Sequence, residues 1–491
     1  MADSSQFVLG GDLAGKPVSQ GLRLANRHGL VAGATGTGKT VTLQHLAEAF
    51  SDAGVAVFAA DVKGDLCGLG AAGNPQGKVA ERIAGMPWLN HRPQAYPVTL
   101  WDIHGQSGHP LRTTLSEMGP LLLGNLLELN DSQQAALYAA FKVADREGLL
   151  LLDIKDLKAL LGHLKDNPQV LGEDAALMTS GSTQALLRRL ATLEQQGAEA
   201  LFGEPALQLE DLLHPAADGR GRIHLLDASR LVHEAPKVYA TFLLWLLAEL
   251  FEQLPERGDA DKPLLALFFD EAHLLFSGTP KALQDRLEQV VRLIRSKGVG
   301  VYFVTQSPGD LPDDVLAQLG LRIQHGLRAF TAKEQKSLRA VADGFRPNPA
   351  FDTLAVLTEL GIGEALVGTL EEKGTPAMVE RVLIAPPQSR IGPLNETERA
   401  ALIAVSPLVG RYDKPIDRES AYEMLMARKG EAAEPPTAAQ KEEESLADKA
   451  GEFLQSAAGQ AIKSAVRQAA NQFGRQLVRG LMGSLLGSKR R

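Results

Sequence analysis

Short apolar runs recur along most of the chain and alternate with stretches of helical periodicity. Most of these runs lack a polar face, and several end at an aspartate. Continuous apolar strands that alternate with helices predict a parallel β-sheet covered by helices on both faces. The predicted strands are Gly29–Ala32, Val55–Asp61, Tyr96–Asp102, Arg222–Asp227, Pro263–Asp270, Val299–Gln306 and Leu321–Leu327.

Apolar residues at intervals of three and four predict the intervening helices. Leu43, Leu46 and Phe50 give this spacing after the first predicted strand. Further helices are expected at Val238–Leu254 and Lys281–Ser296. The chain is therefore expected to adopt an α/β fold with a mainly parallel sheet.

The order of these signals divides the chain into segments. Residues 110–215 are mostly helical in pattern, which predicts a helical insertion within the α/β core. We expect residues 363–385 to add edge strands, whereas the signal in residues 1–28 is weak. A polar, Pro/Glu-rich stretch after residue 428 is typical of a flexible linker. The predicted segments are core halves at 1–105 and 221–427, an insertion at 106–220, a linker at 428–450 and a basic amphipathic helical tail at 451–491.

Composition narrows the class of protein. The chain has 491 residues, of which 44% are hydrophobic and 22% charged, as in ordinary globular proteins. Cys67 is the single cysteine, so one chain can build neither a disulfide framework nor a cysteine-type zinc site. We find no signal peptide and no apolar run long enough to span a membrane, and we expect a cytoplasmic protein. The net charge of −8 excludes a chain that coats nucleic acid over its whole surface.

The stretch G-A-T-G-T-G-K-T at residues 33–40 matches the phosphate-binding pattern G-x-x-x-x-G-K-[ST]. Glycines allow the backbone to turn tightly and to bring its N–H groups against phosphate oxygens. A lysine in this place reaches the β- and γ-phosphates, and the following hydroxyl binds Mg²⁺. The pattern predicts an ATP site made by Gly33, Ala34, Thr35, Gly36, Thr37, Gly38, Lys39, Thr40 and Val41.

A carboxylate pair ends the apolar run at Leu264–Phe269. In the hypothesis of a phosphate loop, Asp270 holds Mg²⁺ together with Thr40, and Glu271 acts as general base toward water. Taken alone, the pair has an alternative explanation as a helix cap with a solvated neighbour. Gln306 closes the next predicted strand and either senses the γ-phosphate or merely caps the strand.

These motifs, followed by G-V-G-V-Y-F-V-T-Q-S-P at residues 298–308, resemble the HerA/FtsK superfamily of DNA-pumping ATPases. The stretches L-A-N-R-H-G-L at 24–30, A-D-V-K-G-D-L at 60–66, R-L-I-R-S-K-G-V-G-V at 292–301 and D-R-E-S-A-Y-E-M-L at 417–425 resemble its YjgR-like, HerA-type helicase family. The resemblance implies a RecA-like P-loop core, ATP and Mg²⁺ as cofactors, a homohexamer and DNA as a partner.

The resemblance also implies an arginine donated from one subunit to the site of the next. Arg295 lies in the matching place, before G-V-G-V, and Arg292 is the fallback. Arg295 and Arg292 are alternatively explained as solvated helix residues, and Arg322 and Arg328 are weaker candidates. A guanidinium suits this task because charge spreads over the γ-phosphoryl oxygens in the transition state.

Some features of the superfamily are absent from the sequence. Residues 1–28 leave no room for the β-barrel domain of HerA, and no FtsK-type membrane anchor or winged helix is recognised. DNA as the track therefore depends on resemblance alone. The alternative hypothesis is a slow NTPase that serves as a switch or scaffold, whose nucleotide state controls assembly or partner binding without acting on DNA.

Three further features allow more than one interpretation. Asp61 ends a predicted strand and is either a strand-end cap or a second carboxylate near Mg²⁺. His28 and His273 lie near the site, but no third ligand completes a zinc set. The tail after Gly451 carries seven basic residues against one acidic residue. It could dock on the protein itself, form an oligomer helix, bind nucleic acid or lie on a membrane surface.

Overall fold

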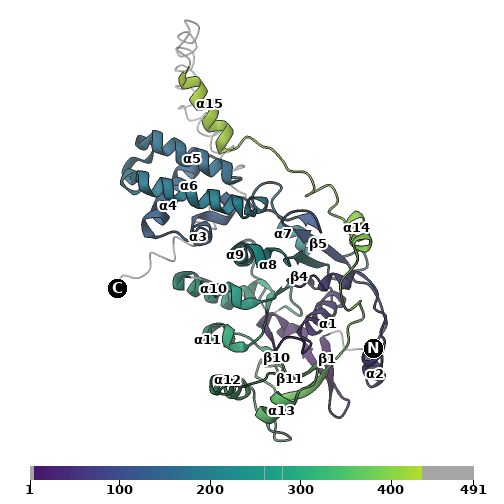
Figure 1. Cartoon of the computed structure of the whole chain (residues 1–491). Helices are drawn as coiled ribbons and strands as arrows, with labels where there is room; N and C mark the ends of the chain where they lie inside the picture. The colour runs from purple at the N-terminus through teal and green to yellow at the C-terminus, as the bar shows by residue number, and fades with distance from the viewer. Residues whose placement is uncertain (1–4, 259, 279, 434–491) are drawn as a thin grey trace. The chain divides into compact units, whose positions relative to one another are not determined.

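The computed structural model describes residues 5–258, 260–278 and 280–433. Contacts divide it into two compact units (Figure 1). The first unit runs through Leu111 and resumes from Leu207 to Lys414, and it holds the sheet. The second unit consists of the inserted residues 112–206 together with the described chain from Pro415 to residue 433.

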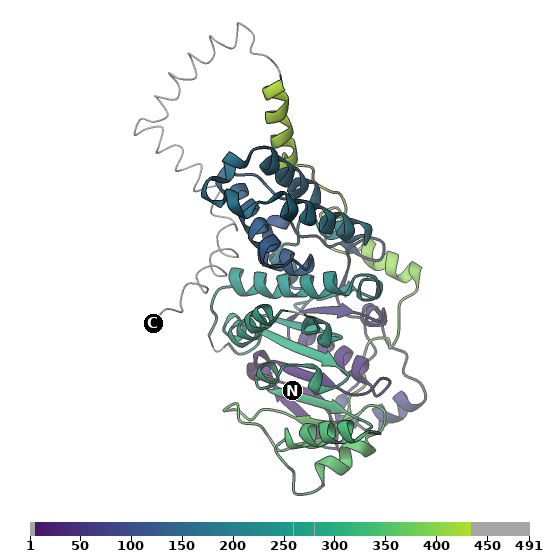
Figure 2. The same cartoon turned by 60° about the vertical axis from the view of Figure 1, so that its left-hand side comes forward.

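The first unit is built on one sheet, which has 12 strands in the described residues. Its central strands are parallel, as the apolar runs predict. Spatial order differs from chain order, so strands from distant parts of the sequence lie side by side (Figure 2). The strands in spatial order are β2 (Pro17–Gly21), β1 (Gln6–Asp12), β12 (Glu380–Ile384), β11 (Glu364–Gly368), β10 (Leu321–His325), β3 (Gly29–Ala32), β9 (Val299–Thr305), β8 (Leu265–Phe269), β4 (Ala56–Asp61), β7 (Ile223–Asp227), β5 (Val98–Asp102) and β6 (His109–Pro110).

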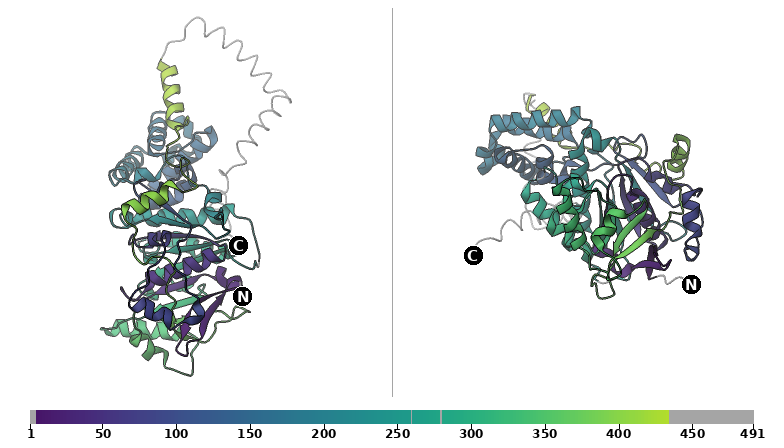
Figure 3. Two further views of the ribbon diagram at one scale, coloured as in Figure 1. Left: turned by 90° about the vertical axis from the view of Figure 1, so that its right-hand side faces the viewer. Right: turned by 60° about the horizontal axis from the view of Figure 1, so that its bottom comes forward.

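The structure adds two strands that the sequence did not predict, and it corrects one expectation about the edge of the sheet. The first 28 residues, whose signal is weak, form β1 and β2, which pair antiparallel with each other. Residues 363–385 do contain strands β11 and β12, but these are not at the edge of the sheet, because β1 pairs antiparallel with β12. Figure 3 shows the green strands of this segment beside the purple N-terminal strands.

Helices cover both faces of the sheet, as predicted. Figure 1 shows α1 (Lys39–Asp52), α2 (Lys78–Ala84) and α14 (Glu396–Ala404) on one side. The opposite side carries α9 (Pro236–Gln253), α10 (Lys281–Ile294), α11 (Asp313–Leu316) and α12 (Ala332–Asp343). Leu43, Leu46 and Phe50 of α1 are buried against the sheet, so the predicted apolar face is the packed face. The short helices α7 (Leu209–Leu213), α8 (Leu231–Glu234) and α13 (Thr353–Glu359) complete the unit.

The second unit is a helical bundle. Its helices are α3 (Leu115–Leu126), α4 (Asp131–Glu147), α5 (Ile154–Asp166), α6 (Ser180–Gln195) and α15 (Ala421–Ala433). Leucines at helical spacing form its core, including the fully buried Leu160 and Leu190. Capping boxes at Thr114, Asn130 and Asp153 begin α3, α4 and α5.

The start of the predicted linker is helical, because α15 extends through residues 428–433. Tyr422 donates its backbone N–H to Asp156 over 2.9 Å, and Ala421 donates to the Leu150 carbonyl over 2.9 Å, which fixes α15 on the bundle. The remaining linker and the tail at 451–491 lie outside the described residues. No helix in the described part of the chain has both the length and the apolar character needed to cross a bilayer.

Candidate nucleotide site

A glycine-rich loop joins β3 to α1. Gly33, Gly36 and Gly38 have φ angles of 153°, 78° and 116°, values that residues with a side chain rarely adopt. Two of them are also crowded. A Cβ added to Gly33 would lie 2.5 Å from the Cβ of His325, and one on Gly38 would lie 3.2 Å from the backbone of Gly363. Glycine is therefore needed at these two positions for both its φ angle and its small size.

The loop is fastened to the carboxyl ends of neighbouring strands. Gly33 donates its N–H to the Thr305 carbonyl over 3.3 Å, and Ala34 donates to Gly326 over 3.2 Å. On the other side of the loop, the Thr37 carbonyl accepts from Gly363 over 2.9 Å. These contacts fix the loop at the edge of the sheet where parallel α/β proteins bind their ligands.

Lys39 and Thr40 begin α1, and Val41 follows in the same turn. The Lys39 ammonium donates to the carbonyl oxygens of Gly33, at 2.5 Å, and Ala34, at 3.1 Å. The side chain is buried, and burial lowers its pKa, as does the nearby Lys63. Asp270 and Glu271 act in the opposite direction and raise this pKa, so both carboxylates lie within electrostatic range of the ammonium.

Asp270 and Glu271 follow β8, as predicted, and β9 lies between β8 and β3. Burial raises the pKa of Asp270 to about 6, although the Glu271 N–H donates to its carboxylate over 2.9 Å. The buried Tyr239 of α9 donates its hydroxyl to the Asp270 carbonyl over 2.7 Å. The backbone position of Asp270 is thus fixed from the helical layer behind the sheet.

Glu271 has a left-handed backbone conformation, with φ at 49°. Such a conformation costs a residue with a side chain about 1 kcal/mol and is concentrated at functional sites. Its Oε2 lies 3.3 Å from Nδ1 of His273. The strained turn directs the chain away from β8 at the point where the two carboxylates are presented.

Gln306 follows β9, between the strands that carry the loop and the carboxylates, and its side chain is exposed. The preceding Thr305 donates its hydroxyl to Asp310 over 2.7 Å, while its carbonyl accepts the Gly33 N–H. The amide of Gln306 therefore belongs to the same edge as Lys39, Asp270 and Glu271.

Arg295 and Arg292 lie at the opposite edge. Both are exposed, and the Arg295 carbonyl accepts from Asn26 over 3.3 Å. Asn26 precedes β3, whereas the glycine loop follows it, so Arg295 is remote from the loop of its own chain. Of the weaker candidates, Arg322 is engaged with the carbonyls of Leu316 and Gly344, and Arg328 is exposed.

Asp61 caps the turn that follows β4. Its carboxylate accepts the N–H groups of Gly64, Asp65 and Leu66 at 2.8 to 3.1 Å. Burial raises its pKa to about 7. Of the two interpretations of Asp61 from the sequence, the strand-end cap is the one that these contacts support.

His325 was missed by the sequence reasoning. It ends β10, where its Nδ1 donates to the Glu364 carbonyl over 2.9 Å and its Nε2 lies 2.9 Å from the Thr42 hydroxyl of α1. Burial lowers its pKa to about 4, so the ring is neutral at physiological pH. A polar residue ending an apolar strand was the available signal, but its partners are far away in the sequence.

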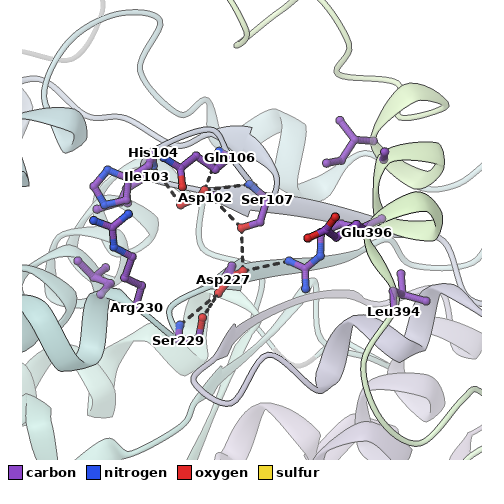
Figure 4. A pocket seen from close by; sticks show the side chains of 14 residues that line it. Asp102, Ile103, His104, Gln106, Ser107, Asp227, Ser229, Arg230, Leu394 and Glu396 are labelled. Atoms are coloured by element: carbon purple, nitrogen blue, oxygen red, sulfur yellow. Dashed lines mark hydrogen bonds and ion pairs between the residues drawn. The ribbon is translucent and has the colours of Figure 1, made fainter.

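A cavity of about 590 Å³ lies away from the glycine loop, at the carboxyl ends of β5 and β7 (Figure 4). Asp227 accepts from the hydroxyls of Ser107, at 2.7 Å, and Ser229, at 2.6 Å, and forms an ion pair with Arg399 of α14 at 3.0 Å. Asp102 accepts backbone N–H groups of the loop that follows β5. The two carboxylates thus fix that loop and α14.

Comparisons with known proteins identify a family and a fold. The sequence model of the family described as "Helicase HerA-like C-terminal" matches residues 7–491. A search of curated protein sequences finds no match.

Solved structures with a similar fold include the bacterial conjugative coupling protein TrwB in a truncated form, TrwBdeltaN70. It is 15% identical with a TM-score of 0.53, over 80% of this chain and 91% of that chain. TrwB in complex with ADP and Mg²⁺ is also 15% identical, with a TM-score of 0.51 over 78% and 90%. VirB4 of Thermoanaerobacter pseudethanolicus is 17% identical, with a TM-score of 0.49 over 81% and 99%. At these identities, the TrwB structures show a shared P-loop fold.

Proposed function

Because the chain belongs to the helicase HerA-like C-terminal family, we propose that it hydrolyses ATP with Mg²⁺ as a hexameric motor that moves along or unwinds DNA. One observation carries the chemical part of this proposal. Lys39, at the start of α1, lies within electrostatic range of Asp270 and Glu271 at the same edge of the sheet. A cation beside a glycine loop, at the same sheet edge as two carboxylates, suits a triphosphate with its metal ion.

The residues present fit the proposed nucleotide. Position 33 leaves no room for a Cβ, and position 38 is tightly packed against Gly363. The loop and the N-terminus of α1 together offer backbone N–H groups to an anion. Lys39 would exchange its two carbonyl partners for phosphate oxygens. Thr40 and Asp270 supply the hard oxygen ligands that Mg²⁺ prefers. Solved TrwB with ADP and Mg²⁺ supports this choice of cofactors by analogy of fold.

Three side chains would carry out hydrolysis. Glu271 would accept a proton from the attacking water, and the amide of Gln306 would orient that water from the neighbouring strand end. Bound Mg²⁺ would neutralise charge that develops on the phosphate oxygens. Arg295 would act on the site of an adjacent copy, because it lies at the edge opposite its own glycine loop.

The test is the rate of ATP hydrolysis with and without DNA, together with the mass of the protein in solution. We expect a hexamer whose turnover rises severalfold with DNA. The Glu271→Gln variant should bind ATP but lose turnover, by about a hundredfold or more for the loss of a general base.

Other outcomes would assign the protein differently. Slow hydrolysis that ignores DNA, combined with nucleotide-dependent partner binding, would favour a switch or scaffold. A monomer with full turnover would contradict the proposed ring. Loss of ATP binding in Glu271→Gln would mean that this residue holds the nucleotide rather than activates water.

A further inference from the structure

Beside the glycine loop, an isoleucine is exposed on a turn that contacts the loop directly. Ile362 is 75% exposed, so its aliphatic side chain is accessible to a ligand bound at the loop. Its neighbour Gly363 donates to the Thr37 carbonyl over 2.9 Å and packs on the backbone of Gly38. Ile362 is therefore the sequence neighbour of Gly363, the residue that contacts the phosphate loop.

A guanidinium from another element covers the same turn. Arg82, in α2, donates through Nη2 to the Ile362 carbonyl over 2.9 Å. A Cβ added to Gly363 would lie 2.1 Å from Nη1 of Arg82 and 3.0 Å from its Cζ, so the guanidinium extends across Gly363. Gly363 has a φ of 76°, and its lack of a side chain permits this approach. Arg82, Ile362 and the loop thus form one continuous surface.

The charge of Arg82 is only weakly compensated. Burial lowers its pKa, and the nearby Glu364 raises it. Glu364 is itself engaged with Arg381 at 2.7 Å and with the Gly361 N–H at 3.0 Å. Within the described part of the chain, no carboxylate comes within ion-pair distance of Arg82. A planar cation beside an exposed aliphatic side chain, next to a phosphate loop, is the chemistry that receives a nucleobase.

We propose that Arg82 and Ile362 form the subsite that receives the base of the nucleotide held by the glycine loop. This inference rests on the proposed function. The guanidinium stacks on the flat face of the base, and Ile362 contacts its edge. Stacking is stronger for the larger purine ring, and neither residue reads individual base atoms. The subsite therefore favours purine over pyrimidine nucleoside triphosphates and discriminates little between ATP and GTP.

The experiment compares ATP with inorganic tripolyphosphate, which shares the phosphates but has no base. We measure KM for ATP, GTP and CTP, and the inhibition constant of tripolyphosphate, in the full chain and in Arg82→Gln, Ile362→Ala and the double variant. The double variant should raise KM for ATP about tenfold and reduce the preference for ATP over CTP. Inhibition by tripolyphosphate should change less than twofold, because its contacts are confined to the loop.

Arg82→Lys separates stacking from charge, since it keeps the cation but loses the planar face. It should raise KM for ATP nearly as much as Arg82→Gln. Arg92→Gln and Val405→Ala are matched controls, because both residues are exposed in the structure and neither contacts the loop. Both controls should keep the wild-type KM.

Two results would overturn the subsite. In one, the double variant keeps the wild-type KM and the preference for ATP. In the other, ATP and tripolyphosphate weaken equally, which would mean that Arg82 only supports the shape of the loop. A wild-type protein that neither binds nor hydrolyses ATP would instead overturn the proposed function, so the two failures are distinguishable.

Discussion

Glycines of the phosphate loop are required for different reasons, and the difference is visible residue by residue. Gly38 has both a positive φ and a close neighbour, since a Cβ there would lie 3.2 Å from Gly363. Gly36 also has a positive φ, but a Cβ there would meet nothing within 4 Å. The same amino acid therefore serves close packing at one position and backbone freedom alone at the other.

This difference predicts unequal effects of alanine. Gly38→Ala should weaken ATP binding by about tenfold or more, because the loop must move away from Gly363 to admit the methyl group. Gly36→Ala should lose only about 1 kcal/mol of stability, the cost of a left-handed backbone for a residue with a Cβ. Nucleotide titration and urea unfolding of both variants test this. Equal loss of ATP affinity in the two variants would contradict the packing argument.

His28 predicts a dependence of stability on pH. The ring donates through Nε2 to the Val291 carbonyl at 2.7 Å and accepts the Val301 N–H at Nδ1 at 3.0 Å, an arrangement that only the neutral ring satisfies. Burial lowers its pKa from 6.5 to about 4. Between pH 6.5 and about pH 4, the unfolded chain therefore binds a proton on this ring that the folded chain does not bind. The neutral His28 ring makes its full contribution to the free energy of unfolding above pH 6.5, and this contribution is lost as the pH falls toward 4.

The size of this effect follows from the shift. Between pH 6.5 and pH 4, the loss of folding free energy from His28 amounts to about 3 kcal/mol. Other buried histidines, such as His224, titrate in the same direction, so the variant His28→Gln is compared with the wild type at each pH. The difference in free energy of unfolding between the two should be largest at pH 7 and should shrink toward pH 4. A constant difference would show that His28 takes up its proton equally in both states.

The segment after β12 is attached to α1 by buried hydrogen bonds. Glu48 of α1 accepts the N–H groups of Gln388, at 2.8 Å, and Ser389, at 2.9 Å. Gln44, one turn earlier, donates to the Arg390 carbonyl over 2.8 Å. The helix that follows the phosphate loop is therefore fixed to a strand-end segment more than three hundred residues away in the sequence.

Removing this attachment should destabilise the first unit. Glu48→Ala leaves two buried N–H groups without an acceptor, at a cost of about 3 kcal/mol. Glu48→Gln keeps one acceptor oxygen and should cost about half as much. Urea unfolding followed by the fluorescence of Trp101, a buried residue of β5, measures the difference. Equal stability of the two variants would mean that water replaces the carboxylate.

Elements with a local signal could be predicted from the sequence, and elements defined by distant partners could not. The strand before Asp270 is an unbroken apolar run, and the glycine loop is a contiguous motif, so both were predicted with nearly correct bounds. β1 contains two glycines and is stabilised by pairing with β12, which no local pattern reveals. His325 likewise gains its contacts only when β10 lies beside α1 and β11.

The whole molecule presents the parts of the proposed site on two opposite edges of one sheet. Lys39, Asp270, Glu271 and Gln306 follow the carboxyl ends of strands, whereas Arg295 lies beside the residues that precede β3. One copy therefore cannot bring Arg295 to its own loop without breaking the sheet. In a ring, the loop edge of one copy can face the arginine edge of the next.

This arrangement predicts complementation between two inactive variants. Lys39→Ala should abolish hydrolysis by removing the phosphate contact, and Arg295→Ala should abolish turnover while leaving ATP binding nearly intact. In a mixed ring, some interfaces join an intact loop from the Arg295→Ala copy to an intact Arg295 from the Lys39→Ala copy. If neighbouring interfaces work independently, an equal mixture should recover about a quarter of wild-type turnover, since random assembly gives that share of intact interfaces.

The mixture is assayed after dissociation and reassembly, beside a mixture of Lys39→Ala with Glu271→Gln. That control removes two groups of the same edge and should stay inactive, because each interface then lacks one of them. Recovery in the control, or loss of ATP affinity in Arg295→Ala, would contradict the assignment of Arg295 to the neighbouring site.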